Sequence, residues 1–508
     1  MTRLLLFPAL LTGLLAGPAL ADLSVDDAWG VWKAQLRASG VQLEASETHE
    51  AGALQIGEMR LSMALPYELG RFYLRFDGPR FAPVDGGRVA VSFPPVMQAS
   101  AGGEAKDEGS VALALELAGN INGVMSGTAE DAVTEWSSDG YDARLVDLAV
   151  TGEDAGTPEI SGGVRLGPMS VRNTTKIADG QVTITQNAHY NDYVFTYRLS
   201  HPQAGKARTE MSGDASDVTV ESKAVLPVGG VDLLGLARQL RDGLSLKSDA
   251  TAKRSSSRQK VFMADKPLSS QSTEVEDYNL SVALSDAGLD YGGTTGAFNV
   301  DMDAPPVPHV NFGGAGVDAR ALLPLLKQAD AQDAVLKIAL NGLTMDDSLW
   351  DMFDPEGKLE RDPVQLSVDL RAKVKVLFEF LDFRAMLERG ARPSGGAVAV
   401  DQVTLNGMQV DGLGAKMTGS GEVALDNDDW TTFDGIPAPD GSGHFELTGV
   451  NGLIDTLISM GLVQTQEALG LRLMMNMVTR AGEGADTLVS DVEVKKTGEI
   501  SANGQRLR

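Results

Sequence analysis

The 508-residue sequence contains no cysteine, which excludes disulfides, thiolate nucleophiles, cysteine-ligated metals and iron–sulfur clusters. Positive charge is also scarce, because 43 Lys and Arg stand against 70 Asp and Glu, giving a formal net charge of −27. A phosphate backbone binds a basic surface, so we expect no nucleic acid partner. The five histidines are scattered, without the HExxH or HxxxH spacing of a zinc site.

Catalytic motifs are missing as well. The sequence has no Gly-x-Ser-x-Gly nucleophile elbow, and Ser420 and Ser442 lie in bare Gly-Ser-Gly turns. Gly205-Lys206 and Gly357-Lys358 lack the spacing of a nucleotide-binding loop. We therefore expect a protein that is not an enzyme, with no catalytic, cofactor-binding or metal-binding residue and no cofactor.

Carboxylates are the one abundant reactive group. They crowd two segments, which hold Asp346, Asp347, Asp351, Asp354, Glu356, Glu360 and Asp362 in the first, and Asp426, Asp428, Asp429 and Asp434 in the second. Such loops suit Ca²⁺, but neither keeps the EF-hand register. A carboxylate-based hydrolase of envelope polysaccharide is an alternative, although only Trp350 and Trp430 supply nearby aromatic platforms. We interpret both segments as solvated loops.

Residues 1–21 resemble a secretory signal peptide. Arg3 precedes an apolar run, and Ala19-Leu20-Ala21 forms a small-residue cleavage pattern before Asp22. The run is too short to span a bilayer, and no later apolar stretch reaches the ~20 residues that a spanning helix needs. We predict cleavage after Ala21, no transmembrane segment in the mature chain and a periplasmic location, with secretion into the medium left open.

The mature chain opens with signals of an amphipathic helix. Ser24 is a typical N-cap residue, and the acidic side chains that follow suit the positive end of a helix dipole. Trp29, Trp32 and Leu36 fall on one stripe, which predicts a helix over residues 25–39. The stripe either docks on a sheet, which we favour, or forms a lid over a ligand.

From residue 52 onward the apolar period becomes two, which is typical of strands with one buried face. The clearest runs are 59–65, 72–76, 89–93, 111–117, 146–150, 193–199, 278–284, 364–370 and 374–378. Turn signals separate many runs, among them Asp85-Gly86-Gly87, Asp179-Gly180, Asn341-Gly342, Asn406-Gly407 and Thr497-Gly498. The expected fold is mainly β with a few helices: an extended antiparallel, hairpin-connected sheet, curled into a groove or filled by a core.

Helical spacing recurs at residues 231–240, 318–327, 377–387, 453–460 and 466–479, so we expect helices near the C-terminus as well. The polar, partly basic segment 245–271 is the best candidate for a boundary. Repeated Leu-x-Gly tripeptides, such as Leu117-Ala118-Gly119 and Leu405-Asn406-Gly407, are compatible with two related halves. We therefore divide the mature chain into β-rich halves at 22–250 and 251–508.

One-sided strands must cover their apolar face with other parts of the protein or with an apolar ligand. The run Leu473-Met474-Met475-Asn476-Met477 suits an adaptable lining, because methionine fills irregular space. Ordinary core packing is the alternative that we favour.

Three motifs carry a family resemblance: Leu349-Trp350-Asp351-Met352-Phe353-Asp354-Pro355, residues 431–439, and the closing Ala502-Asn503-Gly504-Gln505-Arg506-Leu507. With them the sequence resembles an exported alphaproteobacterial family catalogued as domain of unknown function 2125, over nearly the whole mature chain. That resemblance implies no reaction and no catalytic residue. A more distant likeness to AsmA-type envelope proteins, which have sheet grooves implicated in lipid handling, rests on architecture. We expect a non-enzymatic binding or envelope-maintenance factor whose partner is an apolar ligand, a lipid or another envelope protein.

Overall fold

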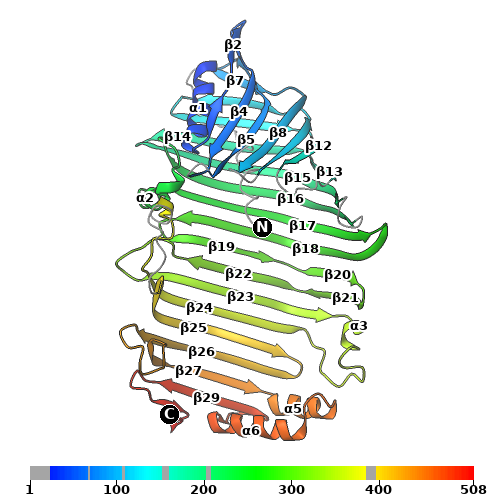
Figure 1. The fold of residues 1–508 in the computed structure, drawn as a ribbon, viewed down its shortest axis with the longest axis vertical. Helices are drawn as coiled ribbons and strands as arrows, with labels where there is room; N and C mark the ends of the chain where they lie inside the picture. Colours follow the sequence, from blue (N-terminus) through cyan, green and yellow to red (C-terminus); the bar gives the residue numbers. More distant parts are fainter. Residues whose placement is uncertain (1–22, 67–68, 106–108, 152–158, 202–206, 385–395) are drawn as a thin grey trace. The chain divides into compact units, whose positions relative to one another are not determined.

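A computed structural model describes residues 23–66, 69–105, 109–151, 159–201, 207–384 and 396–508 (Figure 1). The chain divides into two compact units, which we call unit 1 (residues 1–286 with 382–384) and unit 2 (residues 287–381 with 385–508). This division falls later than the expected one at 250/251. The predicted signal peptide lies outside the described residues. Strands dominate both units, and their pairings are antiparallel, which confirms the expected fold class.

Unit 1 begins with a helix and continues in strands that become longer along the chain. Its elements are α1 (Val25–Ala38), β1 (Gln42–Glu44), β2 (Glu47–Glu50), β3 (Ala53–Ile56), β4 (Glu58–Ala64), β5 (Gly70–Asp77), β6 (Arg80–Val84), β7 (Arg88–Ser92), β8 (Val96–Ala105), β9 (Gly109–Ala118), β10 (Asn122–Gly127), β11 (Asp131–Ser138), β12 (Tyr141–Thr151), β13 (Glu159–Leu166), β14 (Met169–Ala178), β15 (Gln181–His201), β16 (Ala207–Pro227), η3 (Leu233–Gly235), α2 (Leu236–Arg241), β17 (Ser245–Met263) and β18 (Lys266–Ser285).

Two runs of strands meet at β15. One run has the order β1-β4-β5-β8-β9-β12-β13 and the other has the order β2-β3-β6-β7-β10-β11-β14. β14 pairs with residues 181–190 of β15, whereas β13 pairs with residues 193–200. Successive hairpins along the chain are therefore added to the two runs in turn, and both runs contribute to one core.

Helix α1 docks into this core through its tryptophan stripe. Ser24 caps the helix, Trp29 is 1% exposed, and Trp32 packs edge-on against Phe81 with ring centroids 5.6 Å apart. The indole Nε1 of Trp29 donates a 2.7 Å hydrogen bond to Glu47, and this bond, helped by Lys33, lowers the pKa of the Glu47 carboxyl. Docking on the sheet, rather than a lid, is thus confirmed.

Some glycines in these strands lie beneath aromatic rings of the neighbouring strand. A Cβ at Gly123 would approach the Trp136 ring to 2.5 Å, and a Cβ at Gly213 would approach the Phe195 ring to the same distance. Because glycine leaves this space empty, the rings can lie flat on the sheet and shield its backbone.

The four longest strands, β15 to β18, pair in sequence order. Residues 245–271, which we expected to form a boundary, lie within the β17–β18 hairpin, so that prediction is wrong. Lateral pairs such as Arg254 with Glu274, 3.0 Å apart, hold the β17–β18 hairpin together. Apolar alternation revealed residues 278–284 of β18, but it did not reveal the rest of the hairpin, much of which carries polar side chains on both faces.

Unit 2 consists of strands followed by a helical hairpin and a short β segment. Its elements are β19 (Gly288–Thr295), β20 (Phe298–Ala304), β21 (Val307–Gly314), β22 (Gly316–Leu323), β23 (Gln332–Met345), α3 (Asp347–Trp350), β24 (Val364–Val376), β25 (Val398–Gly412), β26 (Ala415–Asp426), β27 (Ala438–Thr448), α5 (Val450–Ser459), α6 (Thr465–Val478), β28 (Arg480–Ala481), β29 (Thr487–Val494), β30 (Ile500–Ala502) and β31 (Gln505–Arg506).

Eight strands of unit 2 form one antiparallel series in the order β19-β22-β23-β24-β25-β26-β27-β29. The helix predicted at 318–327 is wrong, because residues 316–323 form β22 with alternating Val317, Ala319, Ala321 and Leu323. The turns predicted at Asn341-Gly342 and Asn406-Gly407 are also wrong. They lie inside β23 and β25, at irregularities of register, with Gly342 supplying a left-handed φ of +62°.

The helices expected at the C-terminus are present as α5 and α6 (Figure 1). The helix expected at 231–240 is present as the short elements η3 and α2. In the segment predicted to be helical at 377–387, only Phe383 and Arg384 are helical among the described residues, and 385–387 lie outside them.

Candidate functional site

The sheet of unit 2 separates apolar from polar side chains on its two faces. Directly paired residues in an antiparallel sheet lie on the same face. The register places Leu336 opposite Leu370, and Leu370 opposite Leu405. The same registers place Lys337 opposite Asp369, on the other face. One face of these strands is therefore built from aliphatic side chains and the other from charged ones.

The aliphatic face is substantially exposed. Leu323 is 51% exposed, and Leu336 and Ile338 are each 44% exposed. All large apolar side chains that are exposed on β19 and β22 to β25 belong to this face by register: Tyr291, Leu323, Leu336, Ile338, Leu366, Val398 and Val410. We call this surface the open apolar face. Contiguous apolar patches of this kind mark interaction sites in soluble proteins, because leaving them in water is unfavourable.

Ion pairs run across the opposite, polar face. Lys373 lies 2.8 Å from Asp333, Arg320 lies 2.8 Å from Asp290, and Lys337 donates to Asp318. Cross-strand pairs of opposite charge fix the register, since a slip of one residue would move the charges to the apolar face. The ion pairs on the polar face thus fix the strand register that gathers the aliphatic side chains on the opposite face.

Helices contact this sheet only near its margins, as far as the described residues extend. α3 packs against β21, and α5 packs against β26. In the part of the chain that the structure describes, two clusters of buried apolar side chains lie in unit 1. Among the described residues, the central strands β22 to β25 have no helix packed on their apolar side comparable to α1.

The first acidic segment is folded around Arg361. The guanidinium of Arg361 lies 3.0 Å from Asp347 Oδ1 and 5.2 Å from the centre of the Trp350 ring, which is buried. Asp354 is fully buried and accepts hydrogen bonds from the backbone N–H groups of Lys358 (2.9 Å) and Leu359 (3.0 Å). Burial raises the pKa of Asp354, but these two N–H groups together with Arg361 outweigh it and lower the pKa below its usual value.

Asp346 in the same segment caps α3 by accepting from the Leu349 N–H at 3.0 Å. Several of these carboxylates therefore satisfy the chain's own donors. This arrangement stabilises a loop, and it lends no support to the hydrolase hypothesis or to a calcium site.

The second acidic segment is also locally satisfied. Asp429 accepts from both the N–H and the hydroxyl of Thr431 and of Thr432, at distances of 2.6–3.0 Å. These bonds, the Thr432 hydroxyl first, hold the pKa of Asp429 far below its ordinary range. Trp430 is exposed and donates to the Asn427 carbonyl at 2.6 Å. Asp429 thus stabilises a local turn by accepting hydrogen bonds from the residues that follow it.

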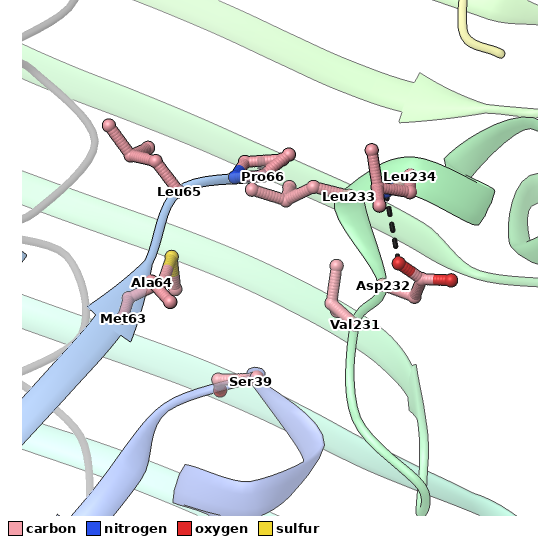
Figure 2. Close-up of a pocket in the computed structure, with 10 residues that line it drawn as sticks. Ser39, Met63, Ala64, Leu65, Pro66, Val231, Asp232, Leu233 and Leu234 are labelled. Carbon is pink, nitrogen blue, oxygen red and sulfur yellow. Dashed lines mark hydrogen bonds between the residues drawn. The ribbon is translucent and has the colours of Figure 1, made fainter. Parts of the chain in front are cut away.

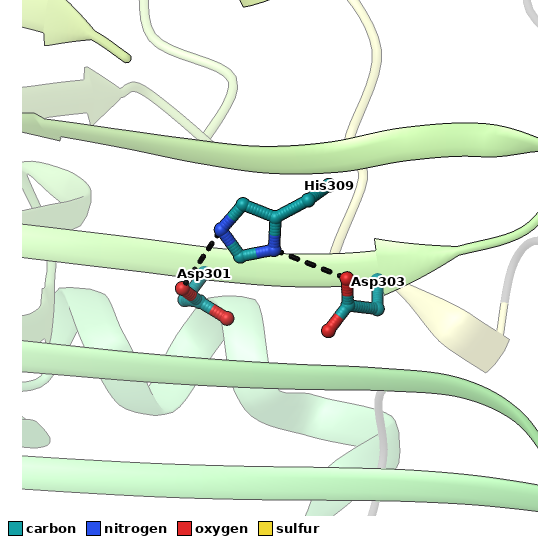
Figure 3. A group of neighbouring side chains, drawn as sticks. All are labelled: Asp301, Asp303 and His309. Atoms are coloured by element: carbon teal, nitrogen blue, oxygen red, sulfur yellow. Dashed lines mark hydrogen bonds and ion pairs between the residues drawn. The ribbon is translucent and has the colours of Figure 1, made fainter. Parts of the chain in front are cut away.

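Sequence patterns did not reveal a small cluster on the β20–β21 hairpin. Figure 3 shows the imidazole of His309 between two carboxylates: Nδ1 lies 3.0 Å from Asp303 and Nε2 lies 3.4 Å from Asp301. The three side chains offer ligand atoms within 4.8 Å of one another, as a metal site would. The carboxylates, however, sit at different ring nitrogens, and an ion binds only one of them. Asp303, with Asp301, raises the pKa of His309, so the geometry favours an imidazolium ion pair. The sequence feature that could have indicated this cluster is Asp301-x-Asp303, followed by His309 six residues after Asp303.

A pocket of about 240 Å³ lies in unit 1 between the end of α1, the end of β4 and η3 (Figure 2). Its lining includes Met63, Leu65 and Leu233. Asp232 supplies the only carboxylate, and it already accepts from the Leu234 N–H at 3.0 Å. Ligand pockets usually measure about 300–1,000 Å³, so this one is smaller than usual. It also offers few polar side chains to orient a ligand, and we do not take it as the principal site.

The methionine-rich run 473–477, expected to line a ligand site, lies on α6. Leu473, Met474 and Met477 are exposed there. The alternation expected at 364–370 belongs to β24 and contributes to the open apolar face. The equivalent residues of β23 were overlooked, although Leu336, Ile338 and Leu340 alternate as clearly.

Neither a scan against protein-family models nor a search of curated proteins matched this chain. The resemblance to the exported alphaproteobacterial family therefore stays a prediction. Among the described residues, the helices are all too short or too polar to cross a bilayer.

Proposed function

We propose that this chain is a non-enzymatic periplasmic protein that binds the acyl chains of lipids on the open apolar face of unit 2. The observation that carries the proposal is the register of β19 and β22 to β25, which gathers on one face seven apolar side chains that are 38–52% exposed. Acyl chains are the apolar molecules common in a bacterial envelope, and binding them removes this surface from water.

The dimensions of the face suit such a ligand. Strands lie ~4.8 Å apart, so the five strands that carry the open apolar face extend over about 19 Å. One leaflet of a bilayer has an apolar thickness of about 15 Å, which is the length that a lipid chain spans. A chain of ~16 methylenes that buries half of its surface gains on the order of 6 kcal/mol from burial, and the entropic cost of holding the chain is subtracted from this gain.

A charge placed on the open apolar face tests the proposal. Ile338→Asp puts a carboxylate among the aliphatic side chains, and we expect at least about a 10-fold loss of affinity for a dansyl-labelled fatty acid. Val335→Asp is the matched control, because it lies three residues away on the other face, opposite Arg371. Circular dichroism and thermal unfolding of both variants verify that the fold is kept.

Native mass spectrometry with lipid extraction completes the test. Protein purified from the periplasm without detergent is expected to carry lipid. Protein that carries none, and that leaves the probe emission unchanged, would refute the proposal. Recovery of an envelope protein by crosslinking, with no small ligand, would favour a scaffolding role instead.

The periplasmic location is part of this proposal and rests on the signal-like residues 1–21. Fractionation of cells that produce the full chain tests it, together with the mass of the mature N-terminus. Full-length chain in the cytosol would contradict it.

A further inference from the structure

α6 carries an apolar stripe that faces away from its helical partner. Leu469, Leu473, Met474 and Met477 lie within about 140° of the helix circumference, given 3.6 residues per turn. Their side chains are 57–69% exposed, which is more than any residue of the open apolar face, where the highest value is 52% at Tyr291. We call these four residues the α6 stripe.

The opposite side of α6 packs on α5. Ala468 is buried there, and Arg472 donates to the Asn451 carbonyl at 2.9 Å and pairs with Asp455 at 2.9 Å. The second charged residue of the helix, Glu467, accepts from the Gln464 N–H at the N-terminus. Both charges of α6 are thus engaged within the helical hairpin, and the α6 stripe itself contains none.

The C-terminal end of α6 is attached to the edge of the same sheet. The Val478 carbonyl accepts from Ser490 Oγ at 2.6 Å and from Asn503 Nδ2 at 3.0 Å. Ser490 pairs with Phe445, and Phe445 with Gly419, so Ser490 belongs by register to the apolar side of the sheet. Helix α6 therefore ends beside β29, the strand at the opposite end of the eight-strand series from β19 (Figure 1).

Charge selects among the possible occupants of the stripe. A second copy of this chain is disfavoured, because each copy carries a formal charge of −27. An anionic bilayer surface is disfavoured for the same reason, and α6 has no basic cluster to attract one. An electrically neutral bilayer interface does not repel an acidic protein, and it accepts leucine and methionine side chains.

We propose that the α6 stripe inserts into the interface of a neutral phospholipid bilayer and brings the sheet that carries the open apolar face to the source of its lipid. This inference rests on the proposed function, since it assigns α6 as the place where the ligand enters. It concerns a separate surface, so the two proposals fail in different assays.

Flotation with phosphatidylcholine vesicles tests the inference. Wild-type protein is expected to float, and Leu473→Glu with Met477→Glu is expected to lower the partition coefficient at least 10-fold while leaving binding of the soluble fatty-acid probe unchanged. Met263→Glu with Leu268→Glu is the matched control, because these residues are similarly exposed at the β17–β18 hairpin of unit 1. It should float like wild type.

Four outcomes overturn the inference. Wild-type protein that does not float with the phosphatidylcholine vesicles would refute the inference, whatever the fatty-acid probe assay shows. Equal losses for the α6 variant and the control variant would mean that the α6 stripe has no special role. A dimer in analytical ultracentrifugation that the α6 variant dissociates would identify a second copy as the occupant. Preference for vesicles containing phosphatidylglycerol would contradict the charge argument.

Discussion

Unit 1 and unit 2 are built from the same kind of one-sided strand, but they treat their apolar faces differently. In unit 1, α1 and two runs of strands close over a core in which Trp29, Leu54 and Phe81 are nearly inaccessible to water. In unit 2, Leu323, Leu336 and Ile338 on the open apolar face are 44–51% exposed. A covered face contributes to stability, whereas an uncovered face is available for binding.

The largest expected effect is on the core of unit 1. Trp29→Ala removes a fully buried indole, and large-to-small changes of this kind cost about 3–5 kcal/mol. Hydrogen exchange followed by mass spectrometry should show faster exchange in β3, β6 and β7, with unit 2 little changed. Equal loss of protection in both units would break the comparison, because it would make them one cooperative structure.

Truncation of side chains on the open apolar face should change stability little and ligand affinity more. Leu336→Ala with Ile338→Ala removes side chains that are already half exposed, so we expect a stability loss of less than about 1 kcal/mol per residue. Affinity for the fatty-acid probe should fall several-fold. Thermal unfolding and probe titration on the same sample measure both quantities. A loss of stability as large as that of Trp29→Ala would show that the face is covered in solution.

Asp354 provides a smaller, pH-dependent effect within unit 2. Its pKa is lowered in the folded protein, so its contribution to stability is present above the unfolded pKa and disappears as pH falls through the folded pKa. Asp354→Asn should therefore weaken the acid dependence of unfolding, followed by the fluorescence of the neighbouring Trp350. Asp362→Asn in the same segment is the control. The hypothesis fails if both variants titrate like wild type.

The smallest expected effect concerns His309. Because Asp303 and Asp301 raise its pKa, its stabilising contribution is complete below the unfolded pKa and is lost as pH rises through the folded value. The imidazole is exposed, so only its titration, followed by NMR, should respond clearly. Asp303→Asn should lower the pKa of His309. A titration that shifts instead on adding Zn²⁺ would favour a metal site over the ion pair.

Sequence patterns predicted most elements whose two faces differ. The helix at 25–39 and the strands at 59–65 and 364–370 were recognised because an apolar stripe or alternation marks them. Apart from residues 278–284, the β17–β18 hairpin was missed because much of it is polar on both faces. β22 was taken for a helix because Leu322, Leu323, Leu325 and Leu326 mimic helical spacing. The Asp301, Asp303 and His309 cluster depends on hairpin register, which one-dimensional spacing does not contain.

The sequence by itself determined the alternation of apolar and polar side chains, and with it an antiparallel sheet that has one aliphatic face. It also determined the absence of cysteine chemistry and of the familiar catalytic motifs. Only the tertiary structure decided which aliphatic face becomes a core and which stays exposed. The physical reason is that alternation fixes the side of a strand to which a residue points, while coverage depends on contacts between distant segments, such as α1 against β6 and β15.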